Sequence, residues 1–178
     1  MSSDSERGAS FNILVSCIRN RERNAVLEVE ELMGNVVGDN SVEAEVTGIK
    51  SLVVAKTSFK PREAIEELRK SAIEDPWRFQ YTLKFTPIDI VVPSGLNSIV
   101  DASKTIISRI LQEETFRITC SRRNSRLHCS EIIKAVASVI DRKVDLEKPD
   151  KVLQIEILGE WAGLAVLDGH DVFSLSKP

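Results

Sequence analysis

Four arginines stand close together in residues 115–130, a segment that contains no acidic residue. They are Arg117, Arg122, Arg123 and Arg126. A guanidinium group can hold two phosphate oxygens through parallel hydrogen bonds, so this cluster is suited to bind a polyanion. Asn124 lies within the cluster and can add a neutral hydrogen bond to a phosphate or a sugar. The alternative is a solvated loop whose arginines pair with nearby acids, and the residue types alone leave both open.

Catalytic signatures are absent from the sequence. The eight glycines form no phosphate-binding loop and no dinucleotide fingerprint, and no nucleophile elbow is present. The two histidines, His128 and His170, limit acid–base schemes that depend on imidazole. We therefore expect no catalytic residue and no cofactor in this chain.

The three cysteines are Cys17, Cys120 and Cys129, an odd number at irregular spacing. This pattern predicts no disulfide framework and favours a reducing compartment, so we expect the protein in the cytoplasm. Cys120, His128 and Cys129 lack the close pairs of a zinc site and a fourth ligand. We expect them to be small buried or half-buried side chains, and we expect no metal.

The composition is that of a globular protein. The 178 residues are 42% hydrophobic and 29% charged, and no run of about 18 apolar residues could cross a membrane. The net charge is −3, and residues 24–49 hold six acids without a lysine or arginine. The chain is therefore not a general polyanion binder, although it can hold one local site. The polar residues 1–10 are expected to be a flexible tail.

The first half alternates predicted strands and helices in the order β-α-β-β-α-β. Strands are expected at 11–17, 42–46, 52–56 and 79–85 from their β-forming residues and alternation. One helix is predicted at 25–33 with Gly34 as its stop, and a second begins at Pro61 and ends before Pro76. This order predicts an α+β fold whose residues 11–86 form a ferredoxin-like domain. The strand 52–56 has no aromatic residue, so base stacking of the kind used by RNA-recognition motifs is not expected.

The second half predicts another α/β unit, over residues 87–178. Strands are expected at 88–92, 115–120, 152–158, 163–167 and 172–175, and helices at 96–111 and 131–141. Ser130 is the expected cap of the later helix. Trp77, at the junction of the two halves, is expected to be a packed side chain, and Trp161 is expected to pack under a turn.

Three segments of this second half match a known pattern. They are the basic strand and loop 116–124, the helix 131–140, and the run Val144-Asp145-Leu146-x-x-Pro149-Asp150, which leads into an apolar strand containing glutamate. Through them, residues from about 80 onward resemble a THUMP domain, the RNA-binding module of several tRNA-modifying enzymes. The first half resembles the ferredoxin-like domain that precedes THUMP in this superfamily. One departure is Ser121, which stands where the family has a basic residue.

The segments 75–77 and 87–89 also resemble the entry to this domain in stand-alone THUMP proteins, which are adaptors for tRNA cytidine acetylation. The resemblance implies tRNA binding through the acceptor region and carries no catalytic residue onto this chain. Two small domains use the whole chain, so we expect no appended catalytic domain. We expect a non-catalytic adaptor that presents tRNA to a separate acetyltransferase forming 4-acetylcytidine, without binding DNA or membranes. The expected RNA-binding residues are Arg122, Arg123, Arg117, Asn124, Arg126 and Lys104.

A second hypothesis stays open beside the adaptor. Paired βαββαβ domains often dimerise edge to edge, so the chain could be a regulatory or small-molecule-binding dimer that binds no RNA. Salt-dependent RNA retention and the oligomeric state discriminate between the two.

Overall fold

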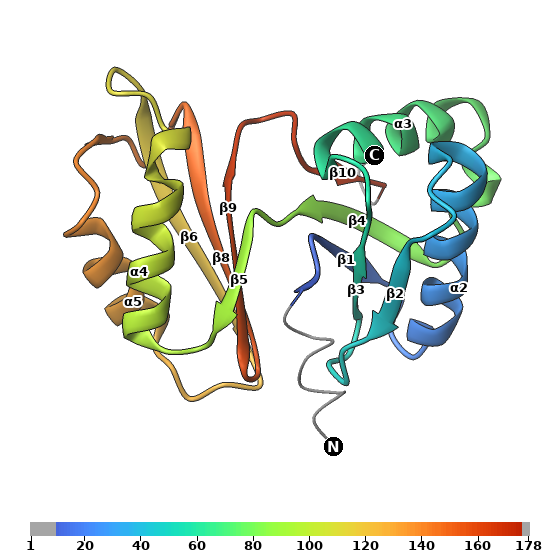
Figure 1. Ribbon diagram of the computed structural model, residues 1–178, viewed down its shortest axis with the longest axis horizontal. Helices are drawn as coiled ribbons and strands as arrows, with labels where there is room; N and C mark the ends of the chain where they lie inside the picture. The colour runs from blue at the N-terminus through green and yellow to red at the C-terminus, as the bar shows by residue number, and fades with distance from the viewer. Residues whose placement is uncertain (1–9, 176–178) are drawn as a thin grey trace. The chain divides into compact units, whose positions relative to one another are not determined.

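The computed structural model describes residues 10–175, which fall into two compact units (Figure 1). One unit comprises Met1–Ile88 together with Asp171–Pro178, and the other comprises Asp89–His170. Residues 1–9 of the predicted flexible tail lie outside the described residues.

The first unit has the predicted order of strands and helices. Its elements are β1 (Ile13–Cys17), α2 (Glu22–Leu32), β2 (Glu43–Val46), β3 (Leu52–Lys56), α3 (Pro61–Glu74), β4 (Thr82–Pro87) and β10 (Phe173–Ser174). Within the described residues the sheet has the order β10-β4-β1-β3-β2, and its neighbouring strands are antiparallel. Helices α2 and α3 cover one face of this sheet.

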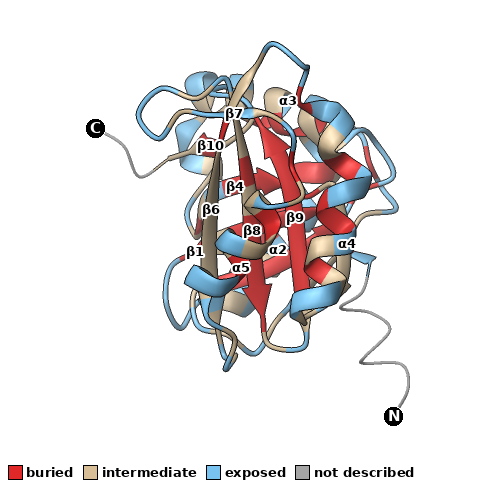
Figure 2. Ribbon diagram, turned by 90° about the vertical axis from the view of Figure 1, so that its left-hand side faces the viewer, coloured by how far each residue is buried: buried red, intermediate tan, exposed pale blue. Residues whose placement is uncertain are grey.

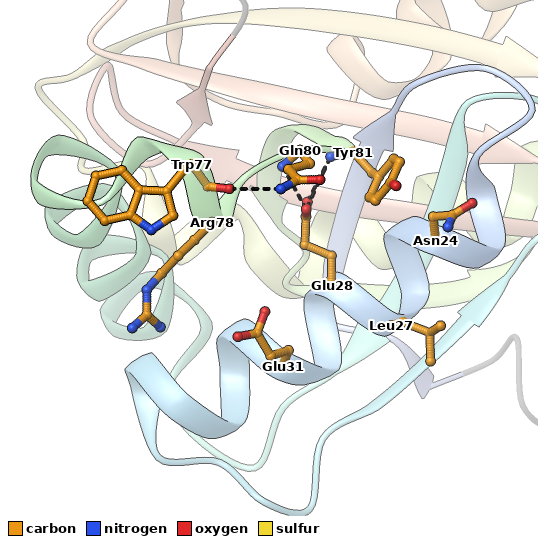
Figure 3. A pocket seen from close by; sticks show the side chains of 8 residues that line it. All are labelled: Asn24, Leu27, Glu28, Glu31, Trp77, Arg78, Gln80 and Tyr81. Carbon is orange, nitrogen blue, oxygen red and sulfur yellow. Dashed lines mark hydrogen bonds between the residues drawn. The ribbon is translucent and has the colours of Figure 1, made fainter.

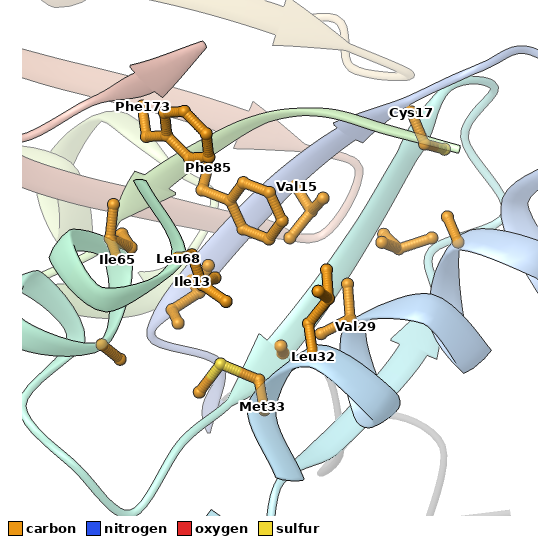
Figure 4. Close-up of a cluster of buried hydrophobic side chains, with 14 residues drawn as sticks. Ile13, Val15, Cys17, Val29, Leu32, Met33, Ile65, Leu68, Phe85 and Phe173 are labelled. Carbon is orange, nitrogen blue, oxygen red and sulfur yellow. The ribbon is translucent and has the colours of Figure 1, made fainter. Parts of the chain in front are cut away.

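The core of the first unit lies between that face and the two helices (Figure 4). Val15 and Phe85 project from the sheet, Val29 and Leu32 come from α2, and Leu68 comes from α3. Each of these side chains is at most 1% exposed. The alternation of the strands and the helical spacing of Val29 and Leu32 thus place apolar side chains on the facing surfaces.

The second unit is a mixed sheet covered by two helices. Its elements are β5 (Ile90–Pro93), α4 (Leu96–Ile106), β6 (Thr115–Arg123), α5 (Cys129–Ala137), β7 (Lys143–Val144), β8 (Lys151–Leu158) and β9 (Trp161–Leu167). The described strands have the order β5-β9-β8-β6-β7, in which β6 is parallel to β7 and β8. Figure 2 shows β8 and β9 as buried strands, whereas most of β6 is half-buried.

Several boundaries differ from the sequence prediction, and three of these differences concern α2, β6 and α5. Helix α2 does not stop at Gly34, because a π-helical turn over Met33–Val37 continues it to the left-handed Gly38. Strand β6 extends through Arg123 because its last residues pair with Ile157 and Leu158 of β8. Helix α5 begins at Cys129 and is preceded by His128, so Ser130 is not its cap.

A further difference concerns the end of the chain. We predicted that residues 87–178 form one unit, but β10 pairs with β4 of the first sheet. Phe173 stacks on Phe85 there at a ring-centroid distance of 5.9 Å. Burying this aromatic ring in the first core explains why the chain returns to the first unit.

Cys120 of β6 and Cys129 of α5 are joined by a disulfide, with their Cα atoms 5.7 Å apart. The prediction that the cysteines form no disulfide is therefore wrong for this pair. The later half of the strand and the start of the helix meet only because the intervening loop turns back, which cysteine spacing cannot reveal. Cys17 is free and 2% exposed, and burial, with the nearby charge of Glu22, raises the pKa of its thiol to about 11.

Trp77 is 66% exposed, so the prediction that it is a packed side chain is wrong. It lies in a short 3-10 turn, Pro76–Arg78, that follows α3. We expect Trp77→Ala to change the free energy of unfolding by less than about 0.5 kcal/mol, because the side chain fills no core. Urea unfolding of both proteins checks this. A loss of about 3 kcal/mol or more, typical of a buried tryptophan, would contradict the exposed position.

No helix among residues 10–175 is long and apolar enough to span a membrane.

Candidate nucleic-acid interface

The basic loop, defined as residues 121–128, connects the end of β6 to the start of α5. Strand β6 delivers Arg122 and Arg123, and Asn124 then turns the chain with a left-handed φ of 58°. Asparagine tolerates this conformation better than most residues, which explains its use at the turn. The backbone N–H of Gly159, in the turn between β8 and β9, donates to the carbonyl of Arg123 at 2.9 Å. The loop is thus attached to the rigid sheet at its first half.

An open hollow of about 570 Å³ lies on this loop and is lined by Arg122, Asn124, Ser125 and Arg126. The guanidinium of Arg122 donates from Nη1 to the carbonyls of Leu127 at 2.9 Å and Ser125 at 3.3 Å. Within the described part of the chain, neither Arg122 nor Arg126 forms an ion pair with a carboxylate. Two uncompensated positive charges and one amide therefore converge at a solvent-accessible site.

Arg123 has a different environment. Successive residues of a strand point to opposite faces, so Arg123 projects away from the face that carries Phe116 and the helices. Its Nη1 donates to Oε2 of Glu156 at 3.1 Å, and the Glu156 carboxylate is 10% exposed. Gln154 donates to the other oxygen of Glu156 at 2.8 Å. Arg123 therefore has its charge balanced by a buried acid of β8.

Arg117 and Lys104 lie at the other end of the second unit. Arg117 is six residues before Arg123 on β6, which corresponds to about 20 Å of strand. Its Nη1 donates to the carbonyl of Leu146 at 3.0 Å, and among residues 10–175 its buried Nε has no hydrogen-bond partner. Lys104 lies in the last turn of α4 and pairs with Asp101 at 3.8 Å. The amino end of α4 lies near the basic loop, because Ser94, just before the helix, donates to the carbonyl of Gly159 at 2.8 Å. Lys104, at the other end of the helix, is therefore far from the loop.

The structure thus brings together three of the six predicted RNA-binding residues. Arg122, Asn124 and Arg126 share the hollow, Arg123 lies on the opposite face, and Arg117 and Lys104 are remote from it. Sequence reasoning missed Glu156 as the partner of Arg123. The glutamate within a largely apolar strand, two residues after Gln154, was the signal that could have identified it.

The run from Val144 to Asp150 has the structural role that its residue types indicate. Oδ1 of Asp145 accepts the backbone N–H groups of Lys148 and Glu147, each at 3.0 Å. These hydrogen bonds lower the pKa of the Asp145 carboxyl. Asp150 accepts the N–H of Thr115 at 2.8 Å and so holds the start of β6. The acids of this run therefore hold a turn and a strand end.

A second hollow, of about 630 Å³, lies on the first unit (Figure 3). Trp77 and Arg78 border one side of it, and Leu27 and Glu31 of α2 border the other. Beneath it, the carboxylate of Glu28 accepts the N–H groups of Gln80, Tyr81 and Thr82 and the hydroxyl of Thr82. Glu28 is therefore a structural residue, whereas Leu27 and Trp77, each 66% exposed, present an apolar side chain on each side of the hollow.

Metal-binding groups do not gather in the part of the chain that the structure describes: residues 10–175 contain no cluster of three or more His, Cys, Asp or Glu side chains that could hold a metal. Cys120 and Cys129 are bonded to each other, so neither is available as a thiolate ligand.

The second unit matches a known protein family. Residues 94–167 match the model of the THUMP domain family. The match includes α4, the basic loop, α5 and the hairpin of β8 and β9. No curated protein matches the chain significantly.

Three solved structures share the fold across both units. PH1313 from Pyrococcus horikoshii OT3 has a TM-score of 0.59 at 17% identity, over 92% of this chain and 55% of its own. TrmN from Thermus thermophilus has a TM-score of 0.56 at 18% identity, over 86% of this chain and 44% of its own. A 4-thiouridine synthetase in complex with RNA and ATP has a TM-score of 0.55 at 12% identity, over 93% of this chain and 42% of its own. The chain therefore spans about half the length of the solved structures it matches.

Proposed function

Because residues 94–167 form a THUMP domain, we propose that this protein binds tRNA and presents it to a separate modifying enzyme. The observation that carries the proposal is the hollow on the basic loop, where Arg122 and Arg126 have no carboxylate partner in the described part of the chain. Phosphate groups of the tRNA acceptor region would occupy this hollow, and Asn124 would contact a phosphate or a sugar. The 4-thiouridine synthetase of the same fold has been solved with RNA, which supports a polynucleotide as the ligand.

In this proposal the chain is not itself an enzyme. Its partner is a cytidine acetyltransferase, its product is 4-acetylcytidine in tRNA, and its compartment is the cytoplasm. The mechanism is positional, since fixing the target nucleotide near a separate active site replaces a random encounter by a local one. Phosphate contacts carry little sequence information, so many tRNAs would bind with similar affinity.

The test is binding of fluorescently labelled tRNA over a series of salt concentrations. Three to four phosphate contacts give a log–log slope of about −2 to −3, at about 0.7 per contact for single-stranded regions. Double-stranded DNA of equal length is the competitor control and should displace tRNA weakly. If the protein does not bind tRNA at low salt, the proposal is wrong.

The edge-to-edge dimer is less well supported. One edge of the first sheet is already occupied, because β10 pairs with β4. The other edge is β2, and it carries Glu43 and Glu45, which would bring like charges together in a symmetric pair. Light scattering during gel filtration measures the oligomeric state directly.

Contact with the enzyme is assigned to the hollow of the first unit. Glu31 beside Leu27 and Trp77 disfavours phosphate there, whereas the two exposed apolar side chains favour a protein surface. In a reconstituted reaction with the acetyltransferase, Leu27→Ala/Trp77→Ala should lower 4-acetylcytidine formation about fivefold or more. The tRNA affinity of this variant should stay unchanged. Acetylation by the chain alone, or equal acetylation with and without it, would contradict the adaptor role.

A further inference from the structure

The disulfide between Cys120 and Cys129 encloses the basic loop. Its sulfur atoms connect the outer part of β6 to the first residue of α5, nine positions later. Between them lie Arg122, Arg123, Asn124 and Arg126, which are four of the six predicted RNA-binding residues. The residues that line the hollow are therefore all inside one covalent ring.

The first half of this ring, through Arg123, is held by the pairing of β6 with β8, by the Gly159–Arg123 hydrogen bond and by the Arg123–Glu156 ion pair. The second half is held by hydrogen bonds within the loop, from Arg122 to the carbonyls of Ser125 and Leu127 and from the Leu127 N–H to Oγ of Ser125. Leu127 is the hydrophobic side chain inside the ring, and it is only partly buried against the core of the second unit. Arg126 and Asn124 are exposed. The covalent bond therefore adds to the order of the second half of the loop, which does not pair with the sheet.

The two bonded cysteines are more exposed than the third cysteine, Cys17. Cys120 and Cys129 are both half-buried, whereas Cys17 is 2% exposed and its raised pKa keeps it a thiol. The disulfide is therefore more accessible to a small thiol than Cys17 is, although Cys120 packs against the core of the second unit.

We infer that Cys120–Cys129 is a reversible redox clamp that holds the basic loop in its RNA-binding conformation. This inference rests on the proposed function. In the reductive step, the thiolate of a small dithiol attacks Sγ of Cys120 and breaks the bond to Cys129. Cys129 leaves as a thiolate at the amino end of α5, where the helix dipole favours negative charge. The second thiol of the reductant then displaces Cys120, so the reductant becomes a cyclic disulfide and the protein gains two electrons and two protons.

Opening the clamp should weaken tRNA binding, because the freed loop must be ordered again when tRNA binds. The chain-entropy model for a ring of this length sets an upper limit of about 100-fold on the loss of tRNA affinity. The remaining hydrogen bonds retain part of the order, so we expect a loss of about three- to tenfold. The salt slope should change little, since the number of phosphate contacts is unchanged.

The experiment compares the oxidised protein, the protein reduced with dithiothreitol, and Cys120→Ser/Cys129→Ser, each with labelled tRNA. Alkylation under denaturing conditions followed by mass spectrometry confirms one free thiol in the oxidised form and three in the reduced form. The double variant should bind like the reduced protein and should not respond to dithiothreitol. If it does not fold, the two forms of the unchanged protein still decide the question.

Equal affinity of the oxidised and reduced forms would overturn the clamp while leaving tRNA binding intact. Absence of binding by both forms at low salt would instead remove the proposed function and the clamp with it. A reciprocal measurement adds a second criterion. If oxidation tightens tRNA binding by some factor, saturating tRNA must shift the thiol–disulfide equilibrium between the protein and dithiothreitol toward the protein disulfide by the same factor. A shift in the opposite direction would overturn the clamp.

Discussion

Replacing Arg122 and Arg126 together by alanine is expected to weaken tRNA binding about 15-fold at 0.15 M salt. Both side chains line the hollow, and neither is paired with a carboxylate among the described residues. Each lost phosphate contact removes about 0.7 from the log–log salt slope, so the slope should become shallower by about 1.4. Titration of labelled tRNA at four or five salt concentrations measures both quantities.

Two controls separate local contacts from general charge. Lys60→Ala/Lys70→Ala removes the same two charges from α3 of the first unit, at side chains that are 82% and 63% exposed. Arg123→Ala/Glu156→Gln removes an ion pair of the second unit without changing the net charge. Both should leave the slope within about 0.4 of the unchanged protein. If Lys60→Ala/Lys70→Ala lowers the slope as much as the arginine variant, the basic loop is not the binding site.

A charge-retaining variant tests the loop structure itself. Arg122 also donates hydrogen bonds to two loop carbonyls, so its loss could disturb the loop as well as remove a charge. Arg122→Lys/Arg126→Lys keeps both charges but not the forked geometry of the guanidinium groups. We expect it to recover the salt slope and only part of the affinity.

Replacing Asp39 by asparagine is expected to cost about 2 kcal/mol of stability at pH 7. Asp39 is 1% exposed and lies just after the left-handed Gly38. Burial alone would raise the pKa of its carboxyl, but hydrogen bonds from Thr57, Ser58 and Ser41 outweigh burial and lower the pKa to about 2. The shortest of these bonds joins the Thr57 hydroxyl to Oδ2 at 2.6 Å. The carboxylate ties the end of the first helix to the segment after β3.

The lowered pKa of Asp39 decides how its contribution to stability depends on pH. A carboxyl whose pKa is lower in the folded than in the unfolded protein stabilises the fold fully above the unfolded value, near 3.8. That contribution is lost as the pH falls toward the folded value of about 2. The stability difference between the unchanged protein and Asp39→Asn should therefore shrink from about 2 kcal/mol at pH 7 to less than about 1 kcal/mol near pH 2.5.

Urea unfolding at pH 7, 4 and 2.5 measures this difference. Glu43→Gln is the control, because Glu43 is an exposed carboxylate on β2. It should alter stability by less than about 0.5 kcal/mol at pH 7. A difference for Asp39→Asn that stays constant across the pH range would show that the charge of Asp39 is not what stabilises the fold.

Local patterns in the sequence determined most of the secondary structure. Strand β3 has the predicted bounds, Leu52–Lys56, because a run of β-forming residues follows a turn. Helix α3 begins at Pro61 and ends before Pro76, since proline suits the first turn of a helix and disfavours helix in the residue before it. The order of the first unit and the basic character of residues 115–130 depended on the same local information.

The roles of the charged residues depended on partners far away in the chain. Glu28 and Asp39 belong to an acidic stretch, yet both are buried acceptors whose donors are up to 54 residues distant. Arg123 was indistinguishable from Arg122 by residue type, but the strand directs them to opposite faces and Glu156 neutralises one of them. Such pairings are set by sheet register and packing, which no local pattern encodes.

The same distinction accounts for the loop and the end of the chain. Arginine content predicted a polyanion site from the sequence alone, because charge density is a property of composition. The tertiary structure decided which arginines share a hollow, that Cys120 reaches Cys129, and that β10 returns to β4. Each of these depends on two segments of the chain that meet in space. Burial of the apolar core fixes where the segments meet, and the residue types at the contact do not.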